Sequence, residues 1–176
     1  MKKLLLFTAL ISFCFTVNAQ ESKFGITAGY QSSSFEISGD GVDISTDASG
    51  YFLGFFAQFS VSESLSIQPE LQYSSVSDDG ESIGDIIIPV MLKFHLSDKF
   101  NFMAGPQFDY ITEDDTEGVK EFGMGLGLGL GYDISDNISL GARYSFGFDI
   151  LDDEGEDVGD ASFKINIFQI GLNYSF

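Results

Sequence analysis

The sequence predicts an all-β protein, an eight-stranded antiparallel up-and-down transmembrane β-barrel. Three observations predict this fold class. Large apolar residues alternate with small or polar ones in eight segments. Short turns and long acidic connections alternate strictly between these segments. After the N-terminal apolar run, no segment shows helical periodicity, so a membrane crossing would have to use strands.

The clearest alternation lies in residues 122–148. From Phe122 to Tyr132 every second residue is large and apolar, and every residue between is glycine. Because successive strand side chains point to opposite faces, this strand has one bulky face and one bare face. After a turn at residues 135–137, residues 138–148 repeat the alternation and complete a hairpin. A soluble sheet rarely lines its wet face with glycine, whereas a narrow membrane barrel needs an apolar exterior and a small-residue interior.

The same alternation predicts six further strands, over residues 23–34, 50–61, 65–74, 86–96, 100–112 and 162–176. Phe52 and Phe56 interrupt the small face of the second strand. Pro69, Pro89 and Pro106 fall inside three consecutive strands, and each removes a donor from the hydrogen-bond ladder. A closed barrel has no edge strand, so we expect a β-bulge at each proline.

The connections divide into two kinds. Long acidic loops are expected at residues 35–49, 76–85, 113–121 and 150–161, and short turns at residues 62–64, 97–99 and 135–137. With both termini in the periplasm, every turn is periplasmic and every acidic loop is extracellular. The aromatic residues then form two interfacial girdles, one near the turns (Phe24, Phe59, Phe94, Phe100, Tyr132, Tyr174, Phe176) and one near the loops (Tyr30, Tyr51, Tyr73, Tyr110, Phe148).

The N-terminal residues 1–19 have the pattern of a secretory signal peptide. Two lysines precede a short apolar run, and Val-Asn-Ala ends at Ala19, so cleavage is expected between Ala19 and Gln20. The only cysteine, Cys14, lies inside this run behind Phe13, which disfavours a lipoprotein anchor. Residues 20–176 then form one barrel domain without disulfides. A net charge of −19 argues against nucleic acid as a partner.

Several segments resemble a known family. They are IQPELQY at 67–73, IPVMLKF at 88–94, MAGP at 103–106, ARYSFG at 142–147 and QIGLNYSF at 169–176. Together they are similar to the small eight-stranded outer-membrane β-barrel family often labelled porin family or PorT-like. The resemblance implies an OmpA/OmpX type of barrel in a Gram-negative outer membrane, prolines in these same strands, and no single biochemical activity. It also implies that the terminal alternation Phe168, Ile170, Leu172, Tyr174 and Phe176 is read by the outer-membrane assembly machinery.

Four charged residues fall on the predicted inward face near mid-strand: Glu70, Lys93, Asp109 and Arg143. The interior of an eight-stranded barrel is only wide enough for side chains to fill it. We therefore expect these charges to pair across the lumen and close it, a structural role; a proton or ion relay is the alternative. His95, the only histidine, lies near a periplasmic turn and away from the loops, so we expect no catalytic residue and no enzymatic activity.

The acidic loops include Glu-Asp-Asp at 113–115 and a run of acidic residues at 152–157. Carboxylate oxygens are calcium ligands, but neither run has the twelve-residue spacing of a defined calcium loop. We expect solvated charge and no cofactor. A weak divalent bridge between loops, or to lipopolysaccharide phosphates, is the alternative.

These patterns predict a monomer with a side-chain-filled lumen that has a structural or surface-interaction role through its acidic loops. Its expected partners are outer-membrane lipid, lipopolysaccharide, the assembly machinery and an extracellular ligand of unknown identity. A narrow pore for small solutes or ions shares every sequence feature except an open lumen. A secreted soluble β-sandwich would need the apolar faces to point inward.

Overall fold

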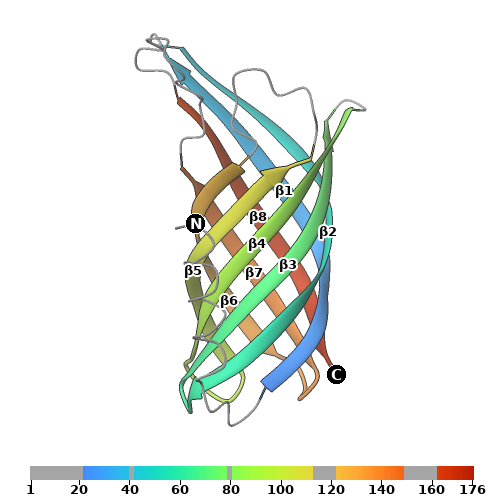
Figure 1. The fold of residues 1–176 in the computed structure, drawn as a ribbon, viewed down its shortest axis with the longest axis vertical. Helices are drawn as coiled ribbons and strands as arrows, with labels where there is room; N and C mark the ends of the chain where they lie inside the picture. The colour runs from blue at the N-terminus through green and yellow to red at the C-terminus, as the bar shows by residue number, and fades with distance from the viewer. Residues whose placement is uncertain (1–21, 40–41, 79–80, 113–121, 149–161) are drawn as a thin grey trace, which may run out of the picture.

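A computed structural model describes residues 22–39, 42–78, 81–112, 122–148 and 162–176. It contains eight strands: β1 (Ser22–Gly39), β2 (Val42–Ser62), β3 (Leu65–Asp78), β4 (Glu81–His95), β5 (Phe100–Ile111), β6 (Phe122–Asp133), β7 (Ile138–Gly147) and β8 (Ser162–Ser175). Each strand pairs antiparallel with its sequence neighbour, and β8 pairs with β1 to close the barrel. The predicted fold class is confirmed. Figure 1 shows the tilted strands, with the C-terminus and the short turns at one end, here named the turn end; the opposite end is named the loop end.

The orientation of the side chains is that of a barrel with an apolar exterior. Along β6, Leu126, Leu128 and Leu130 are 44%, 38% and 61% exposed, whereas the alternating Gly125 and Gly127 are buried. The bulky face therefore points outward and the glycine face inward, opposite to a soluble sandwich. Within the described residues, no helix has the length and hydropathy that a membrane crossing requires.

Phe52 and Phe56 do not disturb the inward face of β2, contrary to the sequence expectation. Both rings are buried in the interior, with 4% and 6% exposure. A Cβ atom added to Gly25 would lie 2.5 Å from Phe56 Cζ, and one added to Gly29 would lie 2.8 Å from Phe52 Cε1. The two rings thus fill space that glycines on the neighbouring strand leave open, which keeps the interior close-packed.

The prediction of a bulge at each proline is wrong. Beside Pro69, Pro89 and Pro106 the ladder loses pairs at the β2–β3, β3–β4 and β4–β5 interfaces respectively, yet the register on both sides of each gap is the same. The missing proline N–H interrupts the hydrogen bonds without inserting a residue. At these three interfaces the described register shift lies between Ser60 and Ser62, next to a turn.

Two predicted loops are largely strand. β1 and β2 remain paired up to Gly39 and Val42, and β3 and β4 up to Asp78 and Glu81, so residues 35–39, 42–49, 76–78 and 81–85 form hairpin extensions at the loop end (Figure 1). Acidic composition suggested loops, but backbone pairing with a partner strand supplies the hydrogen bonds whatever the side chains are. The predicted signal peptide, its cleavage site and the loops 113–121 and 150–161 lie outside the described residues.

Candidate functional site

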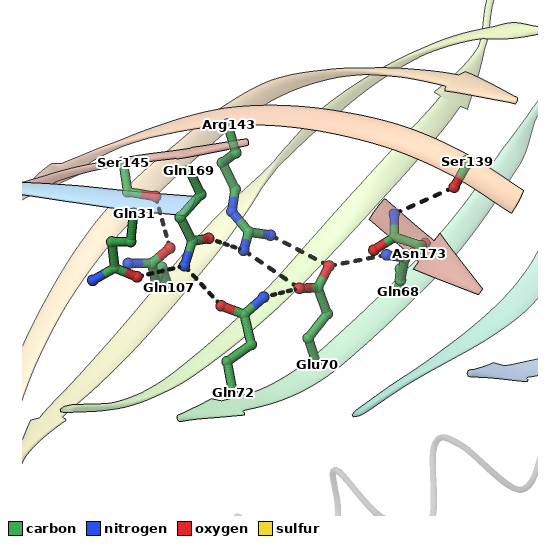
Figure 2. Close-up of polar contacts among 10 residues, drawn as sticks. All are labelled: Gln31, Gln68, Glu70, Gln72, Gln107, Ser139, Arg143, Ser145, Gln169 and Asn173. Atoms are coloured by element: carbon green, nitrogen blue, oxygen red, sulfur yellow. Dashed lines mark hydrogen bonds and ion pairs between the residues drawn. The ribbon is translucent and has the colours of Figure 1, made fainter. Parts of the chain in front are cut away.

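The centre of the interior is an ion pair between Arg143 and Glu70. Arg143 Nη1 lies 3.3 Å from Glu70 Oε1, and Nη2 lies 3.3 Å from Oε2. β7 and β3, which carry these residues, are separated by three strands in either direction around the barrel, so they face each other across the interior. The Arg143 and Glu70 side chains are 8% and 5% exposed. The pair therefore bridges the interior from wall to wall (Figure 2).

Glutamines extend this pair to further strands. Gln169 of β8 accepts from Arg143 Nη2 at 2.6 Å, and its amide donates to Gln31 of β1 at 2.8 Å and to Gln72 of β3 at 2.9 Å. Gln72 also donates to Glu70, as does Gln68 at 2.9 Å. Buried charge is tolerated only where hydrogen bonds replace its hydration. We call Gln31, Gln68, Glu70, Gln72, Arg143 and Gln169 the central network (Figure 2).

A second chain of hydrogen bonds lies nearer the loop end. Ser145 of β7 donates to Gln107 of β5 at 2.7 Å, and Gln107 donates to Asp109 at 2.8 Å. Asp85 of β4 is also buried here, 8% exposed. The interior near the loop end thus holds two buried aspartates, and Asp109 is linked to β7 through Gln107 and Ser145.

The four charges predicted to form one cluster are distributed along the barrel. The structure brings Glu70 and Arg143 together. Lys93 instead donates to Gln58 at 3.2 Å and lies 3.9 Å from the carboxylate of Asp133, towards the turn end. Lys93 is opposite Met103 in the register, so it and Asp109 are separated by six residues along β5, or about 20 Å at about 3.3 Å per residue. All four point inward, but they differ in depth.

Sequence reasoning missed the role of the glutamines. Gln31, Gln72, Gln107 and Gln169 each occupy an inward position and are at most 3% exposed. The sequence feature that could have revealed them is an amide side chain at an inward position on each of four strands. Alternation identified the face, but it could not show that Gln169 meets Gln31 and Gln72, or that Gln107 meets Ser145 at another depth.

His95 lies where the sequence predicted, at the turn end of β4. Its Nε2 is 3.0 Å from Ser66 Oγ. Ser66 is 1% exposed, so a substrate has no access to this hydroxyl. Among the residues that the structure describes, no group of three or more His, Cys, Asp or Glu side chains is placed to hold a metal ion. The acidic runs at 113–115 and 152–157 are outside that part of the chain.

Comparison with known proteins places this geometry in a family. The outer membrane protein beta-barrel domain matches residues 5–176. The chain belongs to this family. The expected resemblance to outer-membrane β-barrels is thereby confirmed, and so is the outer membrane as the place where its strands cross a bilayer.

Solved outer-membrane barrels share the fold of this family member. The attachment invasion locus protein Ail of Yersinia pestis is 14% identical and superimposes with a TM-score of 0.57 over 89% of this chain and 100% of Ail. OprG from Pseudomonas aeruginosa is 14% identical, and the match covers 88% of this chain and 96% of OprG with a TM-score of 0.45. The neisserial surface protein NspA is 15% identical, and the match covers 89% of this chain and 100% of NspA with a TM-score of 0.47. No curated protein sequence matches the chain. At such identities the likeness extends to the fold alone.

Proposed function

We propose that this outer-membrane barrel has a closed interior and acts as a structural or surface-interaction protein through its loop end. The observation that carries the proposal is the central network, which joins opposite walls of the barrel through Arg143 and Glu70. A conducting path would have to break hydrogen bonds among buried groups, and each unsatisfied group costs about 1–3 kcal/mol. The network therefore favours a plug over a pore.

The loop end offers the surface for interaction. The β1–β2 and β3–β4 hairpins extend there beyond the ends of their neighbours (Figure 1), and Glu36, Asp47 and Asp78 on them are exposed. The acidic loops 113–121 and 150–161 follow strands that end on the same side. A surface of this charge suits a basic partner or divalent cations that bridge to lipopolysaccharide phosphates.

Single-channel recording tests the closed interior. Purified protein in planar bilayers should give no discrete openings, and a Glu70→Ala/Arg143→Ala double variant should conduct because the bridge is gone. A Glu36→Ala/Lys164→Ala double variant is the matched control, since these charges are opposite each other in the β1–β8 register, are exposed and lie outside the central network. Ion-selective steps from the unmodified protein would instead establish a narrow pore.

Cysteine labelling of intact cells tests the orientation. Thr46 is exposed at the loop end and Asn137 is exposed in the β6–β7 turn. With loops outside and termini in the periplasm, a membrane-impermeant maleimide should label Thr46→Cys in intact cells and Asn137→Cys only after lysis. The reverse pattern would reject the proposed orientation and the surface role with it.

A further inference from the structure

A cavity of about 400 Å³ opens at the turn end of the barrel, and Gln68 of the central network forms part of its lining. Its wall includes Lys23 at the start of β1, Lys93 and His95 near the end of β4, and the β4–β5 and β6–β7 turns. We propose that this cavity binds a small oxyanion, a carboxylate or phosphate group, on Lys23, Lys93 and His95. Binding requires only the cavity and its charges, and does not depend on whether the lumen conducts.

The positive charge in this cavity is unusual for so acidic a chain. The net charge is −19, with 27 acidic residues against 8 lysines and arginines. Among the lysines and arginines that the structure describes, Lys23, Lys93 and Lys99 line the cavity, whereas Arg143 and Lys164 do not. Three of the five lysines and arginines in the described part of the chain thus line this cavity, together with the three aspartates Asp98, Asp133 and Asp136.

Lys93 is the group best placed to bind an anion. It is 6% exposed, and its Nζ donates to Gln58 Oε1 at 3.2 Å. The nearest Asp133 oxygen in the ion pair is 3.9 Å from Nζ, beyond hydrogen-bond range. An ammonium group has three donors, so Lys93 retains capacity to donate into the cavity.

Lys23 and His95 reinforce this site. Lys23 repels the positive charge of Lys93, which Asp133 attracts more strongly, and both lysines act electrostatically on His95. An anion bound among these groups would attract both lysines, in a region where the dielectric constant is lower than in bulk water.

The remaining lining determines the size and chemistry of the ligand. Phe56, Ile134 and Ile138 form the apolar part of the cavity wall. The amide and hydroxyl side chains of the lining can donate to further oxygens of an anion; they belong to Gln58, Gln68, Asn137, Asn173, Ser135, Ser139 and Ser175. The acidic residues of the lining differ from Lys93 in hydration. Asp98 and Asp136 are exposed on turns, and the Asp133 side chain is 30% exposed against 8% for Lys93. The negative charge of these three aspartates disfavours a polyanion and limits the ligand to a small anion.

The test is an NMR titration of the isotope-labelled barrel in lipid nanodiscs at constant ionic strength. Inorganic phosphate and succinate serve as separate probes, with chloride as the reference salt. We expect saturable shifts of the Gln58, Lys93 and Ser139 amides. Lys93→Gln and Lys23→Gln should each weaken binding about tenfold, because each removes a charge-assisted hydrogen bond. Lys164→Gln, a charge change at the loop end, should leave it unchanged.

Each outcome bears on the proposal. Saturation by phosphate alone assigns the site to phosphoryl groups, and saturation by succinate alone assigns it to carboxylates. Absence of saturable shifts with both probes would overturn the proposal, as would equal weakening by Lys164→Gln, which would indicate a bulk charge effect. If Lys93→Gln does not fold, Lys23→Gln decides, because its half-buried side chain contributes less to packing.

Discussion

Single side chains determine how the interior is held together, and Arg143 supplies the cation at its centre. It contacts Glu70 through both terminal nitrogens and Gln169 through one. Without Arg143, Glu70 keeps hydrogen bonds from Gln68 and Gln72 but loses its only described cationic partner within ion-pair distance. The main cost of removing one member of the pair is therefore the unpaired charge of the other member, which stays buried.

Arg143→Ala should lower the free energy of unfolding by about 3–5 kcal/mol, because it leaves the carboxylate of Glu70 buried and unpaired. Urea unfolding from lipid vesicles measures the change. Lys164→Ala, at an exposed position, is the control and should have little effect. A Glu70→Gln/Arg143→Met variant should recover part of the loss, since no orphan charge remains. An Arg143→Ala barrel as stable as the unmodified one would show that the pairing does not matter.

Two inward glycines should respond differently to the same substitution. A Cβ added to Gly29 would lie 2.2 Å from Ile170 O and 2.8 Å from Phe52 Cε1, whereas one added to Gly141 meets nothing closer than 3.8 Å. Gly29→Ala should therefore destabilise the barrel by about 1–3 kcal/mol through overpacking. Gly141→Ala should be close to neutral. The same unfolding measurement compares them, and equal effects would mean that the interior relaxes freely around both.

At the scale of elements, strand pairing extends beyond the closed barrel. β1 has 18 residues and β2 has 21, although about 9–11 tilted residues suffice to cross the hydrocarbon layer. The surplus forms the β1–β2 hairpin extension at the loop end. The proposed surface role would use this extension, although its β1 side also pairs with β8 as far as Ser38.

Replacing residues 36–45 with Asn-Gly should leave the barrel stable. Phe35 and Thr46 are cross-strand partners, so a two-residue turn can join them in the existing register. Heat-modifiable migration on gels, which separates folded from unfolded barrels, should remain as in the full-length protein. Loss of folding would show instead that the extension contributes to barrel closure through its pairing with β8.

The whole molecule depends on an exterior that matches lipid. Phe55, Leu71, Leu126 and Ile170 come from different strands, and each is more than a third exposed. In hydrocarbon an open sheet would leave backbone groups unpaired, and the β1–β8 ladder removes that cost by closing the sheet. Stability in lipid thus requires both an apolar exterior and a closed sheet.

Leu128→Arg should cost about 2–4 kcal/mol of folding free energy in lipid vesicles, as expected for a cation facing lipid near the bilayer midplane. Leu128 lies near the middle of β6 and points outward. Leu96→Arg is the matched control, because Leu96 is 68% exposed and lies just past the end of β4, where about 0–1 kcal/mol is expected. Equal costs at the two positions would contradict the placement of the bilayer around the strands.

The sequence was sufficient for the fold because one local rule, alternation with a period of two, applies in every strand. It assigned Leu126 to the outside and Gly127 to the inside without knowledge of any contact. It was insufficient for the interior, since Lys93 and Asp109 share an inward face with Arg143 yet lie at other depths. Depth depends on the stagger between strands, which no single strand encodes.

The alternation, the order of turns and the family resemblance were determined by the sequence alone, because each depends on residues close together in the chain. Only the tertiary structure decided that Arg143 meets Glu70, that Phe52 covers Gly29, and that the prolines interrupt the ladder without a bulge. These features depend on the closed register, which brings distant residues to the same height inside the barrel.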